Sequence, residues 1–308
     1  MKKVPPTNDL MFKKLFGSDE NKPLLQGLIH DVWDLDVAVE DIVIVHAYSI
    51  KAYEKAVVEK ERSPDLSFDR EIKLHETLRD ITVVCPQADL LTEFQVRNDD
   101  FFDWRILYYA FQRFCDNYNA PGRMRLDSGG RPNRFSSLRS VKVLSILGHT
   151  HFGDDSDAFR VFDLHDLAHG ASYPGGPLTV AAFELRKPRV DGMLRYWREF
   201  FTGMPLGPGA PSYIVEAEAK LDYWNLSQEE RAVIDLLERA EARRETEDYT
   251  IWREGRDEGR REGRDEGQTQ MIAAMRAYGL DAESIARIQE LAGSAQGDAS
   301  SEGVADGD

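Results

Sequence analysis

Apolar residues at helical spacing mark the first elements of the chain. Residues 9–16 follow a cap at Thr7 or Asn8 and stop at a glycine, which predicts a short helix. The same spacing predicts helices over residues 22–33, 101–118 and 193–201. Ser227-Gln228-Glu229-Glu230 is a capping-box sequence and predicts the start of another helix.

The helix expected over residues 101–118 has the most strongly patterned sequence. Arg105, Tyr109 and Gln112 share one of its faces. A second, apolar face is expected to turn toward the core, and it consists of Trp104, Leu107, Tyr108, Phe111, Phe114, Cys115 and Tyr118.

Short runs rich in apolar and β-branched residues predict strands between the helices. Residues 80–84 and 90–96 are joined by Pro86-Gln87-Ala88-Asp89, so we expect them to form a hairpin centred on Pro86 and Gln87. Further strands are predicted over residues 42–48, 140–147 and 178–185. Alternating strands and helices indicate an α/β fold around a mixed sheet for residues 1–187.

Beyond residue 187 the pattern becomes helical. We expect a helical extension over 188–247, a Glu-Gly-Arg repeat over 248–267, short C-terminal helices over 268–291 and a disordered tail over 292–308. A helical repeat would align oppositely charged residues four apart, but each glycine costs ~1 kcal/mol in a helix. The repeat is therefore either a helix that needs a partner against its glycines, and so a route to homo-oligomers, or a flexible charged linker.

Composition narrows the class of protein. With 42% hydrophobic residues the chain can bury a core, and it has no apolar run of transmembrane length. Cys85 and Cys115 are its only cysteines, and residues 1–6 do not resemble a secretory signal. We therefore expect a reduced, cytoplasmic protein that does not bind membranes.

The charge distribution changes the expectation about nucleic acids. A net charge of −16 argues at first against DNA as a partner. Residues 1–187, however, carry 24 basic and 29 acidic side chains, whereas residues 188–308 carry 15 and 26. Within the first part, residues 121–142 form a basic stretch with turn residues, which is either a DNA-contacting loop or a solvated one. Its candidate DNA-binding residues are Arg123, Arg125, Arg131 and Arg134.

The predicted hairpin brings two carboxylates together. Glu93 and Gln95 share a strand face, and a turn centred between residues 86 and 87 puts Asp80 opposite Glu93. Converging carboxylates favour a divalent cation, and Mg²⁺ held there would activate water and stabilise charge on a phosphodiester. A sheet face with two ordinary carboxylates and no metal is the simpler alternative.

Several motifs occur in order along the chain. They are Asn8-Asp9-Leu10-Met11-Phe12-Lys13-Lys14-Leu15-Phe16-Gly17, Asp80-Ile81, Glu93-Phe94-Gln95, the set Phe102, Arg105, Tyr108 and Tyr109, and Phe183-Glu184-Leu185-Arg186-Lys187. The Glu-Gly-Arg repeat and Tyr278-Gly279-Leu280-Asp281 follow them. Together they resemble the Rpn family, the recombination-promoting nucleases and transposases of the PD-(D/E)XK superfamily.

The resemblance implies a restriction-endonuclease-like fold, in which a mixed sheet is flanked by helices. It also implies that Asp80 and Glu93 bind the metal, and that Gln95 takes the catalytic position where the superfamily usually has lysine. The auxiliary residues that it implies are Asp9 on the first helix and Arg105 and Tyr109, which would face the cleft and contact phosphate.

Three departures leave alternatives open. The stretch over residues 121–134 is longer and more basic than the family usually carries there, so it is either a local DNA contact or an insertion. Arg79 precedes Asp80, where the family has an apolar residue, so Asp89 or Asp69 could instead be the partner of Glu93. Gln95 lacks the positive charge of a lysine, although the family shares this substitution. The first hypothesis is a Mg²⁺-dependent DNA endonuclease that promotes recombination or acts as a mobile-element protein. The second is a catalytically inactive module that binds nucleic acid or protein and retains the nuclease fold.

A histidine pair is a further candidate for a metal site. His149 and His151 are followed by Asp154 and Asp155, and histidine and aspartate side chains are both metal ligands. No other histidine or cysteine occurs at a recognisable ligand spacing, so a polar loop explains the pair better.

Overall fold

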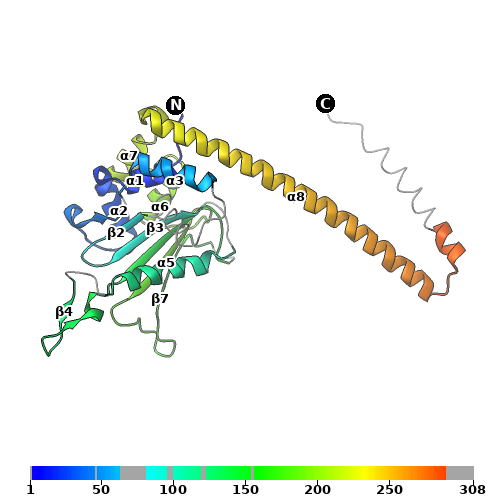
Figure 1. Ribbon diagram of the computed structural model, residues 1–308, viewed down its shortest axis with the longest axis horizontal. Coiled ribbons are helices and arrows are strands. Elements are labelled where there is room, and N and C mark those ends of the chain that lie inside the picture. The colour runs from blue at the N-terminus through cyan, green and yellow to red at the C-terminus, as the bar shows by residue number, and fades with distance from the viewer. Residues whose placement is uncertain are drawn as a thin grey trace. The chain divides into compact units, whose positions relative to one another are not determined.

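The computed structural model describes residues 2–45, 47–62, 81–95, 100–118, 123–153 and 156–288. The chain divides into two compact units, residues 1–235 and 236–308. The first unit is an α/β structure around a mixed six-stranded sheet with helices on its faces (Figure 1). This confirms the expected fold class.

The main sheet has the strand order β1-β2-β3-β6-β8-β7. β3 pairs in parallel with β6, and β6 in parallel with β8, while the remaining neighbours are antiparallel. The strands are β1 (Val43–Ile44), β2 (Ile81–Val84), β3 (Asp89–Gln95), β6 (Val141–Leu147), β7 (Phe159–Asp163) and β8 (Leu178–Glu184). A separate hairpin consists of β4 (Arg125–Leu126) and β5 (Pro132–Asn133).

The helices of the first unit cover both faces of this sheet. They are α1 (Asp9–Phe16), α2 (Lys22–Trp33), α3 (Ile50–Arg62), α5 (Phe102–Asp116), α6 (Leu194–Thr202), α7 (Ser212–Ala219) and the start of α8 (Gln228–Ala277). Short 3₁₀ turns lie at Asp19–Asn21, Val39–Asp41, Arg134–Ser137 and Tyr223–Asn225.

The two sheet faces bury different sets of side chains. On one face, Phe102, Ile106 and Ala110 of α5 pack on a cluster that includes Val143 and Leu147 of β6. On the opposite face, Phe94 of β3 contacts the rings of α1 and α6, with centroids 6.2 Å from Phe12 and 6.4 Å from Phe201. Because neighbouring strand residues point to opposite faces, Glu93 and Gln95 lie on the α5 side.

Local sequence signals placed most of these elements correctly. The Asn8 carboxamide accepts the backbone N–H groups of Leu10 and Met11, and the predicted stop at Gly17 ends α1. The bounds of α2 are those predicted. The hairpin register, with Ile81 opposite Thr92 and Val84 opposite Asp89, is the one expected for a turn centred on residues 86 and 87.

Other expectations need correction. The strand expected over residues 42–48 is reduced to the two residues of β1, and β7, the β4–β5 hairpin and α7 lack a periodic signal strong enough to predict them. On α5 the expected apolar face is only partly the buried one: Leu107 and Phe114 pack against the core beside the buried Phe102, Ile106 and Ala110, whereas Trp104, Tyr108, Phe111 and Cys115 are exposed. Both faces of α5 are rich in apolar residues, so periodicity alone could not select the buried one.

The first and last segments of the first unit close on each other. The Val4 N–H donates to the Leu221 carbonyl at 2.8 Å. Ser227 and Glu230 form the predicted capping box, since each side chain accepts the backbone N–H of the other. Glu230 also lies 2.8 Å from Lys14 Nζ and accepts the Tyr48 hydroxyl at 2.7 Å. This carboxylate therefore joins α1, the segment before α3 and α8.

The Glu-Gly-Arg repeat lies inside α8. A Cβ added at Gly255, Gly259, Gly263 or Gly267 would meet nothing within 4 Å, so these glycines are open to solvent. After α8 the chain turns at Gly279, which has a positive φ of 92°, and Asp281 caps a helical segment over residues 282–288. The tail expected to be disordered lies outside the described residues. No helix in the described part of the chain is long and apolar enough to cross a bilayer.

Acid should weaken the contacts of Glu230. Burial raises the pKa of this carboxyl, but hydrogen bonds from Lys14, the Ser227 backbone and Tyr48 outweigh it, so the pKa lies below its ordinary value of 4.5. A lowered pKa contributes stability above the ordinary value, and this is lost as the pH falls through the folded-state value. Glu230→Gln should cost about 1–3 kcal/mol of unfolding free energy near neutral pH and less at an acidic pH below 4.5.

Urea denaturation at the two pH values measures this difference. Glu229→Gln, at the exposed neighbouring position, is the matched control and should change stability little at either pH. Equal effects of the two substitutions at neutral pH would contradict the assigned role of Glu230.

Candidate functional site

Glu93 and Gln95 form the centre of the candidate site. Both are almost fully buried near the end of β3, with 8% and 7% of their surface exposed. Glu93 lies beside Ser145 of β6 in the parallel ladder, and the Ser145 hydroxyl is 3.5 Å from Glu93 Oε1. A carboxylate and a hydroxyl thus meet on the sheet face that α5 covers.

Arg105 is joined to this centre from α5. Its Nη2 donates to Gln95 Oε1 at 2.9 Å, and the guanidinium is half-buried. Since the amide oxygen accepts from Arg105, the Gln95 amide nitrogen points the other way with its two protons. The structure therefore brings together three of the residues expected in the site, Glu93, Gln95 and Arg105.

Of the expected auxiliary residues, Tyr109 lies on α5 near Arg105 and Asp9 lies on α1. Tyr109 is half-buried one turn after Arg105 on the same flank of α5, and its ring stands edge-on to Tyr108 with centroids 5.8 Å apart. Asp9 is half-buried in the first turn of α1. α1 packs on the sheet face opposite the one that carries Glu93.

The proposed partner carboxylates of Glu93 fall into two groups. Asp80 and Asp69 lie outside the described residues, although the observed β2–β3 register is the one from which Asp80 was expected opposite Glu93. Asp89 is described, and it lies at the other end of β3, about 13 Å from Glu93 along an extended strand. Asp89 is thus unsuited as a direct partner of Glu93.

Asp89 instead forms a buried ion cluster. Its side chain is fully buried, and its oxygens lie 2.7 Å from Arg113 Nη2 and 3.4 Å from Arg139 Nε. The Asn117 amide donates to it at 3.0 Å. The cluster fastens the end of α5 to the start of β3, so it supports the site without taking part in it.

The candidate DNA-binding arginines divide between this cluster and the surface. Arg123 is half-buried and donates to the Asn117 carboxamide oxygen at 2.8 Å, so it extends the cluster around Asp89. Arg125, Arg131 and Arg134 are exposed on the β4–β5 hairpin and the turn that follows it. Arg131 also lies 3.4 Å from Asp127, the acidic residue of the hairpin turn.

The histidine pair has structural partners. His151 Nε2 lies 2.8 Å from Asp103 Oδ1, and its ring packs edge-on against Phe102. His149 is buried, with its ring centroid 6.1 Å from that of His151. Asp154 and Asp155 lie outside the described residues. Across the described ranges no three His, Cys, Asp or Glu side chains gather as a metal-binding group.

A buried carboxylate that was not assigned a role lies on the same sheet face. Glu184 is adjacent to Leu147, which is adjacent to Gln95, and it is fully buried. Glu184 accepts the backbone N–H groups of His151 and Phe152 at 2.7 and 3.0 Å and lies 2.8 Å from Lys187 Nζ. The Glu-Leu-x-Lys motif therefore holds the loop after β6, and its Glu–Lys spacing was the available signal.

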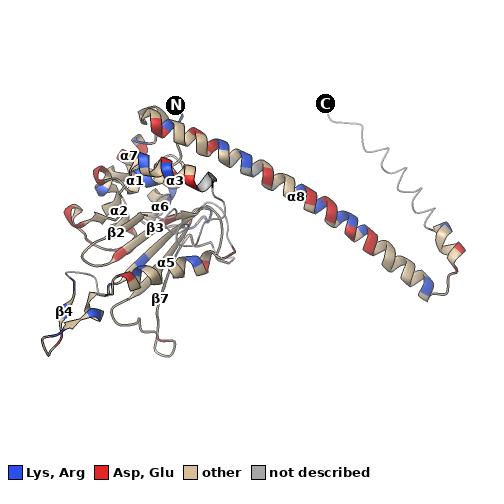
Figure 2. Ribbon diagram, in the orientation of Figure 1, with Lys and Arg blue, Asp and Glu red and all other residues tan. Residues whose placement is uncertain are grey.

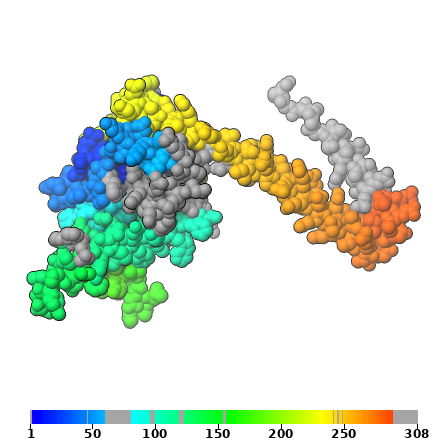
Figure 3. All heavy atoms as spheres, viewed as in Figure 1, coloured from blue at the N-terminus to red at the C-terminus, as the bar shows by residue number. Residues whose placement is uncertain are grey.

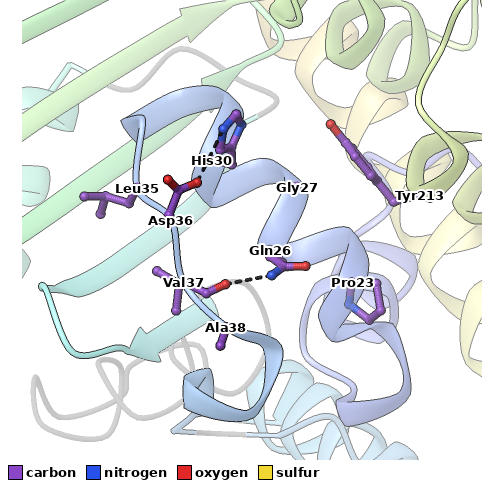
Figure 4. A pocket seen from close by; sticks show the side chains of 9 residues that line it. All are labelled: Pro23, Gln26, Gly27, His30, Leu35, Asp36, Val37, Ala38 and Tyr213. Atoms are coloured by element: carbon purple, nitrogen blue, oxygen red, sulfur yellow. Dashed lines mark hydrogen bonds and ion pairs between the residues drawn. The ribbon is translucent and has the colours of Figure 1, made fainter.

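A pocket of about 440 Å³ lies in the helical layer on the other side of the sheet (Figure 4). Gln26 donates to the Val37 carbonyl across it at 2.7 Å, and the Tyr213 ring stands against Gly27, where a Cβ would approach within 2.4 Å. The pocket is separate from Glu93, since α2 and α7 form it.

The donor chemistry of the site fits a hard divalent cation. Glu93 supplies a carboxylate and Ser145 a hydroxyl oxygen, and oxygen atoms are the ligands that Mg²⁺ prefers. Glu93 is the carboxylate that the described residues place beside Ser145, and Asp80, the second ligand expected from the sequence, lies outside the described residues.

Comparison with known proteins gives one family match. Residues 6–168 match the profile of a family described as PD-(D/E)XK nuclease family transposase. No curated protein and no solved structure matches the chain. The matched range includes α1, the β2–β3 hairpin, α5, the β4–β5 hairpin and β6.

Loss of the Asp89 charge should destabilise the first unit. Asp89→Asn leaves Arg113 and Arg139 without a buried counter-charge, so we expect a loss of about 3 kcal/mol in urea denaturation. Asp157→Asn removes an ion pair to Arg189 in which both side chains are exposed, and it should cost less than about 1 kcal/mol. Similar losses in both variants would show that the Asp89 cluster does not hold α5.

Proposed function

Because the chain belongs to the PD-(D/E)XK nuclease family transposases, we propose that it is a metal-dependent DNA endonuclease that hydrolyses phosphodiester bonds. One observation carries this proposal: Glu93 and Gln95 are buried side by side on one sheet face, with Arg105 hydrogen-bonded to Gln95. Burial disfavours the charged form of a carboxylate, so the almost fully buried Glu93 favours a bound cation.

Each residue has a distinct task in the proposed reaction. Glu93 and Asp80 would hold the divalent metal, which we propose to be Mg²⁺. A metal bound there would polarise the phosphodiester and lower the pKa of a water molecule. Arg105 fixes the amide of Gln95 so that its N–H₂ group donates to a phosphate or water oxygen. We further assign phosphate contact to Arg105 and Tyr109 and a supporting role to Asp9.

The acidic net charge does not oppose a DNA substrate. Acidic and basic residues alternate along α8, whereas exposed arginines gather on the β4–β5 hairpin (Figure 2). We propose that Arg125, Arg131 and Arg134 contact the phosphate backbone and that Arg123 contributes mainly by holding the hairpin. DNA affinity should then fall steeply with salt.

Substitution of Glu93 tests the proposed activity. Glu93→Gln keeps the size of the side chain but removes its charge, so plasmid cleavage in Mg²⁺ should fall roughly 100-fold or more. Asp80→Asn should have a similar effect. Cleavage is measured by gel electrophoresis with Mg²⁺ and with EDTA.

Glu184→Gln is the matched control, because Glu184 is also buried on this sheet face but is held by backbone N–H groups and Lys187. At a temperature where all variants remain folded, it should retain most of the activity. Unchanged cleavage by Glu93→Gln, or cleavage by the wild type in EDTA, would contradict the proposal. A folded wild-type protein that never cleaves would support an inactive binding module.

Strand cleavage is the step from which recombination and transposition begin, and we propose this as the role of the protein. Cys85 and Cys115 are both free thiols, which agrees with a cytoplasmic location.

We also propose that α8 joins two copies of the chain. In the repeat, the stripe Gly255, Gly259, Gly263 and Gly267 has glutamates on one side and arginines on the other. In a parallel pair of helices the glutamate side of one helix meets the arginine side of its partner, whereas an antiparallel pair opposes like charges. The glycines permit close approach, and this contact offsets their helix-propensity cost.

Charge reversal tests the parallel pair. One variant replaces Arg256, Arg260 and Arg264 by Glu, and the other replaces Glu254, Glu258 and Glu262 by Arg. Each variant alone should be monomeric in sedimentation velocity because its flanks repel, and an equimolar mixture should form dimers. A monomeric wild type, or variants that dimerise alone, would contradict this arrangement.

A further inference from the structure

α5 carries large aromatic side chains on the side that faces away from the sheet. Trp104, Tyr108 and Phe111 follow one another at intervals of four and three residues and so lie on one helix face, and Tyr118 lies just beyond the C-terminal end of the helix. Trp104 is 74% exposed and Phe111 52% exposed. Large rings exposed in a row are unusual on the surface of a soluble protein and mark a binding surface.

The row of rings continues onto the segment after the hairpin. Phe135 is 69% exposed, and its ring centroid lies 5.2 Å from that of Tyr118. The Ser137 hydroxyl also donates to the Asn117 carbonyl at 2.6 Å, which holds this segment against the end of α5. We call Trp104, Tyr108, Phe111, Tyr118 and Phe135 the aromatic face.

The aromatic face leads directly to the basic hairpin. Arg125 and Arg131 belong to the hairpin, and Arg134 is adjacent to Phe135; all three are exposed. Asp127, which organises the turn by accepting the N–H groups of Gly129 and Arg131, is the acidic residue among them. Figure 3 shows α5 and the hairpin on the same visible face of the first unit.

We propose that the aromatic face and the basic hairpin bind a single-stranded segment of nucleic acid. Sequence-tolerant binding of single strands requires aromatic rings on which unpaired bases stack and cations that follow the phosphates, and this surface supplies both. In a duplex the faces of the bases are stacked on one another and are open only at the ends, so a duplex would leave the rings of α5 unused. A second copy docked on α5 would cover the rings but give the exposed arginines no role.

The position of the surface links it to the proposed nuclease site. Arg105 lies on a flank of α5 beside the aromatic face, and through it Gln95 and Glu93 adjoin the same helix. From Trp104 to its last residue, Asp116, the helix rises about 18 Å. This inference rests on the proposed function in that the cleaved polymer is DNA, and it specifies a substrate with an unpaired stretch.

Binding is tested with the full chain in EDTA, where metal-dependent cleavage does not occur. The probes are a fluorescein-labelled deoxythymidine 20-mer and a labelled 20-base-pair duplex, followed by fluorescence anisotropy. The wild type should prefer the single strand. Trp104→Ala combined with Phe111→Ala should raise the Kd for it at least about tenfold. Both positions are exposed and alanine is the best helix former, so α5 should remain folded.

Two further sets of variants sharpen the result. Trp252→Ala combined with Tyr249→Ala removes exposed rings of α8 and should leave the Kd unchanged. Arg125→Ala combined with Arg134→Ala should lower the slope of log Kd against log salt by about 0.7 for each phosphate that an arginine no longer neutralises.

Three outcomes would overturn the proposal. They are an unchanged Kd in the α5 double variant, tighter wild-type binding to the duplex, and a loss of dimers in that variant without any change in Kd. The last would identify the aromatic face as an interface between copies.

Failure of the nuclease proposal is separable from failure of this one. Glu93→Gln should lose cleavage but bind the single strand like the wild type. Single-strand binding that depends on the aromatic face would support this inference even if no variant cleaves DNA.

Discussion

The buried charge of Asp89 is the constraint on which the arrangement around α5 depends. A fully buried carboxylate is tolerated only with counter-charges and hydrogen bonds, and here Arg113 and Asn117 of the α5 end and Arg139 before β6 supply them. These contacts fix the end of α5 against the start of β3. Packing of Phe102 and Ile106 on the sheet then determines which side of the helix faces inward.

The buried Asp89 cluster also determines which side chains of α5 face Gln95 and which are exposed to solvent. With its two ends held, the flank that carries Arg105 reaches Gln95 at the opposite end of β3. Arg123 donates to Asn117 and so fastens the base of the basic hairpin to the same cluster. One buried aspartate thereby sets the relative positions of the strand that carries Glu93, the outward rings and the exposed arginines.

Sequence reasoning succeeded where the signal was local. Asn8, Gly17 and the Ser227–Glu230 capping box fix helix ends through neighbouring backbone groups, and Pro86 fixes the hairpin register. It failed where tertiary contacts decide. Both sides of α5 are apolar, and only the cluster around Asp89 and the sheet beneath select Ile106 over Trp104 as the buried residue. The family resemblance put Arg105 in the cleft of Gln95, but the hydrogen bond between the two side chains was not predicted because it depends on the docking of α5.

The closure of the first unit by its own terminal segments bears on its synthesis. Lys14 of α1 pairs with Glu230, and Val4 with Leu221, so the earliest helix acquires its final contacts only after more than 200 further residues have been translated. β3 likewise needs β6 and β8 as parallel neighbours, and such long-range pairing forms late. A nascent chain that ends before β8 therefore lacks the parallel neighbours that complete the strand face carrying Glu93.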